Sequence, residues 1–331
     1  MQCAISRQLV TGLTVNKKVN IRADYYRSAR AMCNSLFTTG TYIWAHDFAA
    51  AVPISNMQRL EGVLNHINYV KDASDQRETK EKRERPSVAA KLYGELLFYK
   101  NFVNLSRPLI LCEGVTDNIY LKTALRKLPA FEPKLIEPKG KAKEAKISFF
   151  KYTTLADKIL RLGGGAGGIK NFITHYHKAM KRYKHALLKH PVIILIDNDD
   201  GAKEIFSVIN SKYKIKPSLI SKELFYPICH NLYLVKTPEQ GAVGTSCIED
   251  FFDASVRGMK LGDKTFNPSK QLDPAKEFGK VPFAEKIILP NKDKINFVKL
   301  SPIFDRIVAA MDHYKPPVIA PAGVAAGGLK P

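Results

Sequence analysis

Acidic residues lie next to apolar residues at three places in this sequence. Glu113 and Asp117 lie in "ILCEGVTDNIYL", residues 110–121; Asp197, Asp199 and Asp200 lie in "IILIDNDDG"; Glu249 and Asp250 lie in "TSCIEDFF". Three carboxylates within four positions repel one another unless a cation neutralises them. Hard oxygen ligands of this kind suit Mg²⁺ or Mn²⁺. The pattern therefore predicts chemistry that uses a divalent metal ion.

The apolar segments that must position these residues are typical of central β-strands. "PLILC", "PVIILI" and "NLYLV" are short runs of the kind found in strands buried on both faces, and helical stretches separate them. This layout predicts a mostly parallel sheet with flanking helices, in which Glu113 and Asp197 each follow a strand. Ligands of open α/β sheets bind outside the carboxyl ends of the strands, so the location favours a functional site.

Each acidic group also has a purely structural interpretation. Asp117 could be a helix N-cap, residues 197–200 could be a solvated turn, and acidic residues such as Glu249 are favoured at a helix start by the helix dipole. Two other segments are more simply interpreted without a ligand. The glycine-rich residues 162–168 fit a connector better than a phosphate cradle, and His175 and His177 fit a solvated basic helix face.

The front of the chain has a different pattern. Residues 5–21 hold two β-branched runs around Thr11 and Gly12, which predicts a hairpin or a strand pair. Helices are predicted over 24–36, with Asp24 at the cap position and Gly40 as the stop, and over 54–73 and 87–103. Residues 71–87 form a charged connector, and the low-complexity end, 316–331, is expected to be disordered.

The composition is basic and moderately apolar. The chain has 331 residues, 45% of them hydrophobic, and 52 Lys and Arg against 31 Asp and Glu give a net charge of +21. Such a charge attracts polyanions, so nucleic acid is the expected partner, although many basic proteins bind none. The five cysteines include no Cys-x-x-Cys pair, which indicates neither a zinc site nor a disulfide framework and favours a reducing cytoplasm. No apolar run is long enough to predict a membrane span.

The order of the acidic motifs, strand–Glu113-x-x-x-Asp117, strand–Asp197-x-Asp199 and then Glu249, resembles the TOPRIM domain of nucleases, primases and topoisomerases. The resemblance covers about residues 106–290 and is nearest to the OLD-type nucleases. It implies metal-dependent phosphodiester hydrolysis and five metal ligands: Glu113, Asp117, Asp197, Asp199 and Glu249. Cys247 stands where that family commonly has a small residue, so Asp250 remains an alternative to Glu249. "GKVPFAEKI" resembles a late element of such domains, which implies that Lys280 steadies the scissile phosphate.

A second resemblance covers about residues 5–100. "LVTGLTVNKKVNI" and the basic, aromatic helix after it resemble the palm–thumb junction of bacterial retron reverse transcriptases, including the triplet Val10-Thr11-Gly12. The resemblance implies binding of structured RNA and of the DNA copied from it. The residues expected to contact nucleic acid are Thr11, Lys17, Lys18, Tyr25, Tyr26, Arg27 and Arg30. The chain contains no Tyr-x-Asp-Asp polymerase motif.

Together these observations predict an α/β protein with a TOPRIM-like, mostly parallel sheet, preceded by an α-helical, thumb-like segment. The expected divisions are 1–21 for the remnant of a palm–thumb junction, 22–104 for the helical segment, 105–315 for the nuclease domain and 316–331 for the tail. We expect the chain to be the C-terminal part of a longer retron enzyme that acts in anti-phage defence, in the cytoplasm, with Mg²⁺ or Mn²⁺ as cofactor. These observations are also compatible with a homo-oligomer. The alternative is a non-catalytic module for nucleic-acid binding or assembly.

Overall fold

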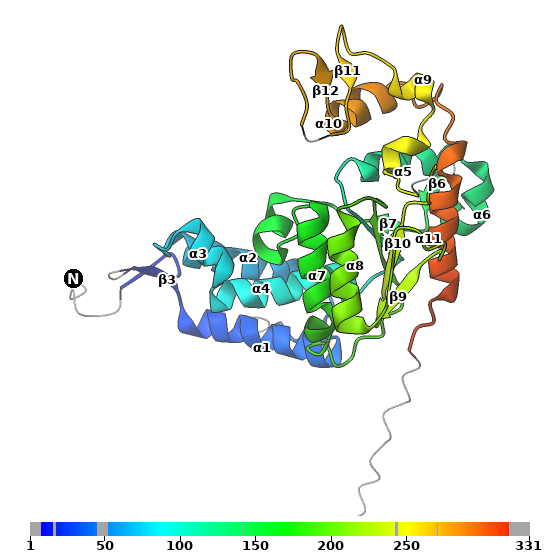
Figure 1. Ribbon diagram of the computed structural model, residues 1–331. Coiled ribbons are helices and arrows are strands. Elements are labelled where there is room, and N and C mark those ends of the chain that lie inside the picture. Colours follow the sequence, from blue (N-terminus) through cyan, green and yellow to red (C-terminus); the bar gives the residue numbers. More distant parts are fainter. Residues whose placement is uncertain are drawn as a thin grey trace, which may run out of the picture.

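The central feature of the molecule is a five-stranded sheet of order β7-β4-β8-β10-β9 (Figure 1). The computed structural model describes residues 8–15, 18–44, 52–140, 142–241, 244–269 and 271–317. Four strands are parallel, and β9 pairs with β10 in the antiparallel direction. The strands are β4 (Leu109–Cys112), β7 (Ser148–Phe149), β8 (Val192–Ile196), β9 (Tyr226–Cys229) and β10 (Leu232–Lys236). The predicted mixed α/β class and mostly parallel sheet are confirmed.

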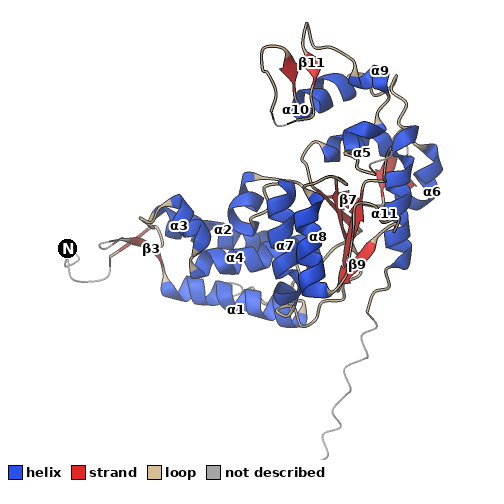
Figure 2. Ribbon diagram, in the orientation of Figure 1, coloured by secondary structure: helices blue, strands red, loops and turns tan. Residues whose placement is uncertain are grey.

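Helices cover both faces of the sheet, so its central strands β4, β8 and β10 are buried at every position (Figure 2). Successive side chains of a strand point to opposite faces. Leu109 and Leu111 of β4 accordingly join one core, with helices α7 (Gly165–Met180) and α8 (Ala202–Tyr213). Ile110 and Cys112 join the other core, with α5 (Asp117–Leu125) and α11 (Ser301–His313).

The predicted helices of the front segment are present, with small changes at their ends. They are α1 (Ala23–Thr39), α2 (Met57–Ala73), and α4 (Val88–Phe98) with its π-helical continuation η1 (Tyr99–Val103). Asp24 does not cap α1, because Arg22 holds the cap position and pairs with the Asp24 carboxylate. Gly40 ends α1 as predicted, with φ +83°. The charged connector contains the short helix α3 (Thr79–Glu84).

A small antiparallel sheet precedes α1. It consists of β1 (Leu9–Val10), β2 (Leu13–Val15) and β3 (Val19–Ile21), in that order. The turn between β1 and β2 uses Thr11 at φ +46° and Gly12 at φ +84°, the positive angles that a tight two-residue hairpin turn requires. The predicted hairpin is therefore confirmed.

The front helices and the sheet share one continuous core. Phe98 and Phe102, at the end of α4 and in η1, pack on Phe172 and Tyr176 of α7, and the ring centroids of Phe102 and Phe172 are 4.6 Å apart. Buried residues of α1, α2 and α4 belong to the same cluster as Leu109, Leu111 and Ile194 of the sheet. The parts of the chain on either side of the boundary expected near residue 104 therefore share one packed core.

Short elements fill the connections. Before α7 come η2 (Pro129–Phe131), α6 (Glu132–Leu135), the hairpin β5 (Ile136–Lys139) and β6 (Ala142–Ala145), and η3 (Ala156–Leu160). After β10 come η4 (Ile248–Phe251), α9 (Ala254–Arg257), β11 (Thr265–Phe266), β12 (Glu277–Phe278), α10 (Lys280–Pro282), η5 (Phe283–Ile288) and η6 (Val298–Leu300). The part from α9 to η5 lies at the top of Figure 1. Residues 318–331, most of the expected tail, are outside the described range.

Across the described helices, none combines the length and apolar character needed to cross a membrane.

Candidate metal centre

The carboxyl ends of β4 and β8 bring two of the predicted acidic residues together. The strands are parallel neighbours, so Glu113 and Asp197 leave the sheet side by side. The amide of Glu113 donates to the carbonyl of Leu195 over 2.8 Å, which extends the strand pairing by one residue. The amide of Asp197 in turn donates to Oε2 of Glu113 over 3.4 Å. The sheet itself therefore fixes the first two carboxylates.

Asp117 lies in the first turn of α5 and is buried, but it does not cap that helix. Thr116 holds the cap position, and Oδ2 of Asp117 accepts a 2.7 Å hydrogen bond from the amide of Gly114, upstream of the helix. A Cβ atom at residue 114 would lie 2.9 Å from Oδ1 of Asp117, so glycine allows this close approach. The N-cap interpretation of Asp117 does not describe the contact that is formed.

Glu249 lies in η4 and has only 1% of its surface exposed. Both carboxylate oxygens are buried. Nζ of Lys280 lies 2.9 Å from Oε2 of Glu249 and 3.6 Å from Oδ2 of Asp197. The ammonium group thus supplies the opposite charge that a buried carboxylate requires.

The loop after β10 is tied directly to Asp197. Oδ1 of Asp197 accepts a 2.9 Å hydrogen bond from the amide of Ile248, the residue before Glu249. Asp250 faces elsewhere: its Oδ2 accepts from the Cys247 amide at 2.9 Å, and its Oδ1 lies 3.1 Å from the Arg257 guanidinium. Asp250 therefore caps η4, and it is Glu249 that lies beside Asp197.

Burial and mutual repulsion raise the pKa values of these acids. For Asp197, burial and the nearby Asp117 raise the pKa well above its usual range, while Lys280 opposes the shift. The pKa of Asp117 is raised to about 6, first by burial and then by Glu249. The pKa of Glu113 is raised by burial and by Asp199. The cluster therefore has more negative charge than it can stably hold by itself, which favours uptake of a cation.

Lys280 remains charged in this setting. Burial alone would lower its pKa, but the carboxylates of Glu249 and Asp197 hold the pKa above its ordinary value. The side chain is one-third exposed, so the ammonium lies between the buried acids and the solvent. It is placed to meet an anion that approaches the cluster.

The "DND" residues point in different directions, as alternation along an extended chain requires. Asp197 faces the acidic cluster, Asn198 is fully buried on the other side, and Asp199 is exposed near Glu113, whose pKa it raises. Asp199 binds the amide of Gly201 over 2.8 Å. Asp200 is in solvent and pairs with Lys203. The solvated-turn interpretation is thus correct for Asp200 and incorrect for Asp197.

The donor set fits a hard divalent cation, although the side chains are not arranged around one. Within the described residues, no group of three or more His, Cys, Asp or Glu side chains could hold a metal ion as it stands. Lys280 occupies the space between Asp197 and Glu249, and Asp117 is turned to the Gly114 amide. The observation that favours a cation is the burial of both Glu249 oxygens, with one ammonium shared between Glu249 and Asp197. An ion would bind by taking the place of the ammonium.

Sequence reasoning missed several supports of the cluster. The amide of Gly165, where α7 begins, donates to the carbonyl of Glu113 over 2.8 Å, so the glycine-rich segment packs behind the first acid. The hydroxyl of Tyr152 donates to the carbonyl of Cys112, and that of Tyr120 donates to the carbonyl of Lys280 over 3.3 Å. The glycine run in the sequence was a signal for the contact between Gly165 and Glu113. Nothing in the sequence indicated the contacts of the two tyrosines.

The residues expected to contact nucleic acid fall into two groups. Tyr26, Arg27 and Arg30 of α1 line a groove of about 480 Å³ against α4, with Lys91 and Arg182 also in its walls. Tyr25 is half-buried, and its ring packs edge-on against His66. The second group lies on the small sheet, where Thr11 and Lys18 are exposed; Lys17 is outside the described residues.

The two histidines of α7 do not form a ligand pair. His175 binds the carbonyl of Asn171 in its own helix, whereas Nδ1 of His177 lies 3.0 Å from Nε2 of His230. Both α7 histidines are exposed, which agrees with the solvated-face interpretation.

No protein-family model matches the chain, and no solved structure matches it significantly.

Proposed function

We propose that the chain hydrolyses phosphodiester bonds with a divalent metal ion, by means of a TOPRIM-like domain. The observation that carries the proposal is the buried meeting of Asp197 and Glu249, whose charges are balanced by Lys280 alone among the described bases. Glu113 and Asp117 flank them: Glu113 directly follows strand β4, and Asp117 is the first residue of helix α5. Buried acids of this density are unfavourable for folding, which favours a functional reason for keeping them.

Glu113, Asp117, Asp197, Asp199 and Glu249 would hold Mg²⁺ or Mn²⁺. Such an ion supplies Lewis-acid polarisation of a phosphoryl oxygen and acidification of a bound water. Lys280 would pass from the carboxylates to a non-bridging oxygen of the phosphate and neutralise charge there. Asp199, exposed beside Glu113, lies on the side from which a solvent-borne substrate arrives.

We further infer that the substrate is a nucleic acid and that the front segment binds one. A net charge of +21 favours polyanions, and the α1–α4 groove joins Tyr26 to Arg27 and Arg30, an aromatic ring beside two cations. The hairpin followed by helices is compatible with the thumb of a retron-type reverse transcriptase. On this proposal the chain is the nuclease effector of an anti-phage defence protein of the cytoplasm, with Mg²⁺ or Mn²⁺ as cofactor.

The second candidate function is a nucleic-acid-binding or assembly module without catalysis. It is favoured by the same lysine, because the ion pairs of Lys280 with Glu249 and Asp197 already compensate the acids. In such a module the cluster would be a permanent ion-pair network.

A cleavage assay separates the two functions. Labelled tRNA, single-stranded DNA and duplex DNA are incubated with the full chain in Mg²⁺, in Mn²⁺ and in EDTA. We expect metal-dependent cleavage of at least one substrate, its loss in Asp197→Asn, and its retention in the control Asp200→Asn, whose carboxylate is solvent-exposed and paired with Lys203. Cleavage by Asp197→Asn at the wild-type rate would refute the assignment, and uncut substrates under all conditions would favour the assembly module.

A further inference from the structure

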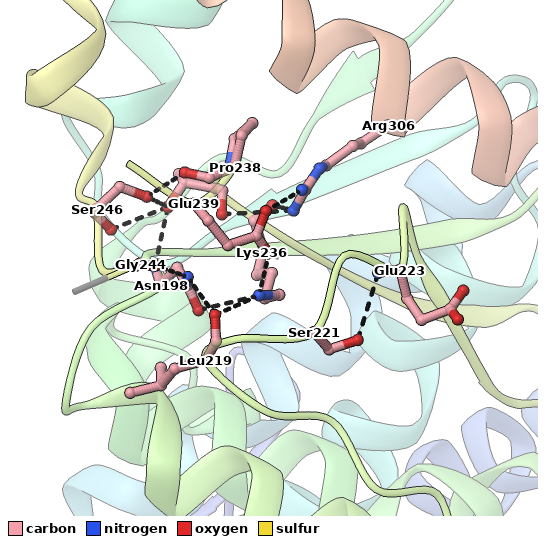
Figure 3. A network of polar contacts seen from close by, with 11 residues as sticks. Asn198, Leu219, Ser221, Glu223, Lys236, Pro238, Glu239, Gly244, Ser246 and Arg306 are labelled. Atoms are coloured by element: carbon pink, nitrogen blue, oxygen red, sulfur yellow. Dashed lines mark hydrogen bonds and ion pairs between the residues drawn. The ribbon is translucent and has the colours of Figure 1, made fainter. Parts of the chain in front are cut away.

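A buried lysine lies directly behind the acidic cluster. Lys236 is the last residue of β10, and its side chain is fully buried. Its ammonium donates to the carbonyl of Leu219 over 2.8 Å, to Oδ1 of Asn198 over 3.4 Å and to the carboxylate of Glu239 (Figure 3). Lysine is almost never fully buried without a specific partner, so this side chain needs an explanation.

The lysine holds Asn198, the middle residue of "DND". The side-chain amide nitrogen of Asn198 donates to the carbonyls of Leu219, over 2.9 Å, and Gly244, over 2.7 Å. The side-chain oxygen of Asn198 accepts from Lys236 (Figure 3). Because Asn198 is anchored on the inner side, its neighbours Asp197 and Asp199 are directed to the other side. The orientation of both acids thus depends on a residue that does not belong to the cluster.

The same network fixes the loop that leads to Glu249. Asn198 and Ser246 exchange both backbone hydrogen bonds, each 2.9 Å long. The hydroxyl of Thr237 accepts from the backbone N–H of Asn198 and donates to the backbone carbonyl of Ser246, each over 2.9 Å. Ser246 is three residues before Glu249, so these bonds link the position of Glu249 to that of Asp197.

Helix α11 closes the network from the far side. Arg306 is buried, and its guanidinium donates to the carbonyl of Lys236 over 3.0 Å and to Oε2 of Glu239 over 2.8 Å. Glu239 thereby bridges two buried cations, and its own carboxylate satisfies both (Figure 3).

We propose that Lys236, Asn198 and Thr237, supported by Glu239 and Arg306, are positioning residues that fix the backbone at Asp197 and the loop before Glu249, so that both acids can bind one divalent cation. The inference rests on the proposed function, since it concerns the same site. Residues behind metal ligands act in this way by fixing the orientation of the ligands, and their loss weakens metal binding without removing any ligand.

The chain offers a matched control at the opposite end of the same strands. Asn231, just before β10, is also fully buried; its amide donates to the carbonyls of His190, over 2.9 Å, and Phe102, over 3.3 Å. Its oxygen accepts from the hydroxyl of Tyr176 over 2.8 Å. Asn231→Ala therefore removes a comparable buried amide network, far along the strands from the acids.

The test measures Mn²⁺ affinity by calorimetric titration of the full chain, with melting temperatures recorded in parallel. We expect Lys236→Met and Asn198→Ala to weaken Mn²⁺ binding about 10- to 100-fold. Asn231→Ala should lower the melting temperature yet bind Mn²⁺ with wild-type affinity. Equal affinities in Lys236→Met and the wild type, or equal weakening in Asn231→Ala, would overturn the inference.

A milder pair covers the case in which Lys236→Met does not fold. Thr237→Val removes only the hydroxyl that joins Asn198 to Ser246, and Thr237→Ser restores it. We expect Thr237→Val to bind Mn²⁺ more weakly and Thr237→Ser to bind as the wild type does; identical binding by both refutes the inference. If the wild type itself binds no Mn²⁺, or Asp197→Asn binds it equally well, the proposed function fails instead.

Discussion

At the scale of residues, Lys280 determines the state of the acidic cluster. Its ammonium stands 2.9 Å from Glu249 and 3.6 Å from Asp197, within the space that an ion would take. On the proposed function, metal uptake would therefore be an exchange of one cation for another, and the released ammonium would become available to a phosphate. Such an exchange would keep the buried carboxylates compensated at every stage, which avoids the large penalty of an unpaired buried charge.

The raised pKa of Asp117 makes a prediction about stability and pH. Its pKa is about 6 in the folded chain, against about 3.9 for an ordinary aspartate. The folded state binds the proton more tightly, so the stabilisation from this group is complete below about pH 4 and is lost as the pH rises through 6. In EDTA, the fall in the free energy of unfolding from pH 4 to pH 8 should be smaller in Asp117→Asn, by up to about 3 kcal/mol.

Urea unfolding at several pH values measures this difference. The control is Asp200→Asn, which alters an exposed carboxylate and should leave the wild-type profile unchanged. Superimposable profiles for Asp117→Asn and the wild type would show that Asp117 does not titrate in this window.

At the scale of elements, the apolar runs were sufficient to predict β4, β8 and β10, because strands buried on both faces are mostly apolar. The same pattern predicted that acidic residues lie at the carboxyl ends of these strands. The support of the acids could not be predicted, because it comes from residues distant in sequence: Arg306 reaches Lys236 across 70 positions. Neither a lysine at a strand end nor an arginine in a late helix indicates, by itself, that it is buried.

Two glycines in the front helices allow an element-scale test with opposite expected signs. At Gly40 a Cβ would meet the ring of His185 at 2.7 Å, in a residue with φ +83°, whereas at Gly62, inside α2, nothing lies within 4 Å. Gly40→Ala should lower the free energy of unfolding by at least about 1 kcal/mol. Gly62→Ala should raise it by about 0.5 to 1 kcal/mol. Urea unfolding measures the free energy of unfolding of both variants. Stabilisation by Gly40→Ala would mean that α1 does not end in a left-handed glycine.

At the scale of the whole molecule, the helical front and the sheet are joined by a common core. The aromatic side chains of α4 and η1 cover α7, and α7 in turn covers the sheet. A break between the two parts would expose this apolar surface to water, which is unfavourable in proportion to its area.

This arrangement predicts that residues 105–315 do not fold by themselves. The isolated segment should bind a hydrophobic dye and melt without a cooperative transition, because Phe172 and Tyr176 lose the partners Phe98 and Phe102. A chain of residues 1–317 is the control and should melt cooperatively. A sharp, reversible melt of 105–315 would show that the sheet is a self-sufficient domain.

The most direct test of the central claim, that the carboxylates behind β4 and β8 hold a divalent cation, is to count bound Mn²⁺ by electron paramagnetic resonance, in which free Mn²⁺ gives the signal. We expect the wild type and Asp200→Asn to bind Mn²⁺, Mg²⁺ to displace it, and Asp197→Asn to lose the binding, since the carboxylate of Asp197 lies inside the cluster and that of Asp200 in solvent. Undiminished free Mn²⁺ with the wild type, or equal binding by Asp197→Asn, would show that these carboxylates do not hold the cation.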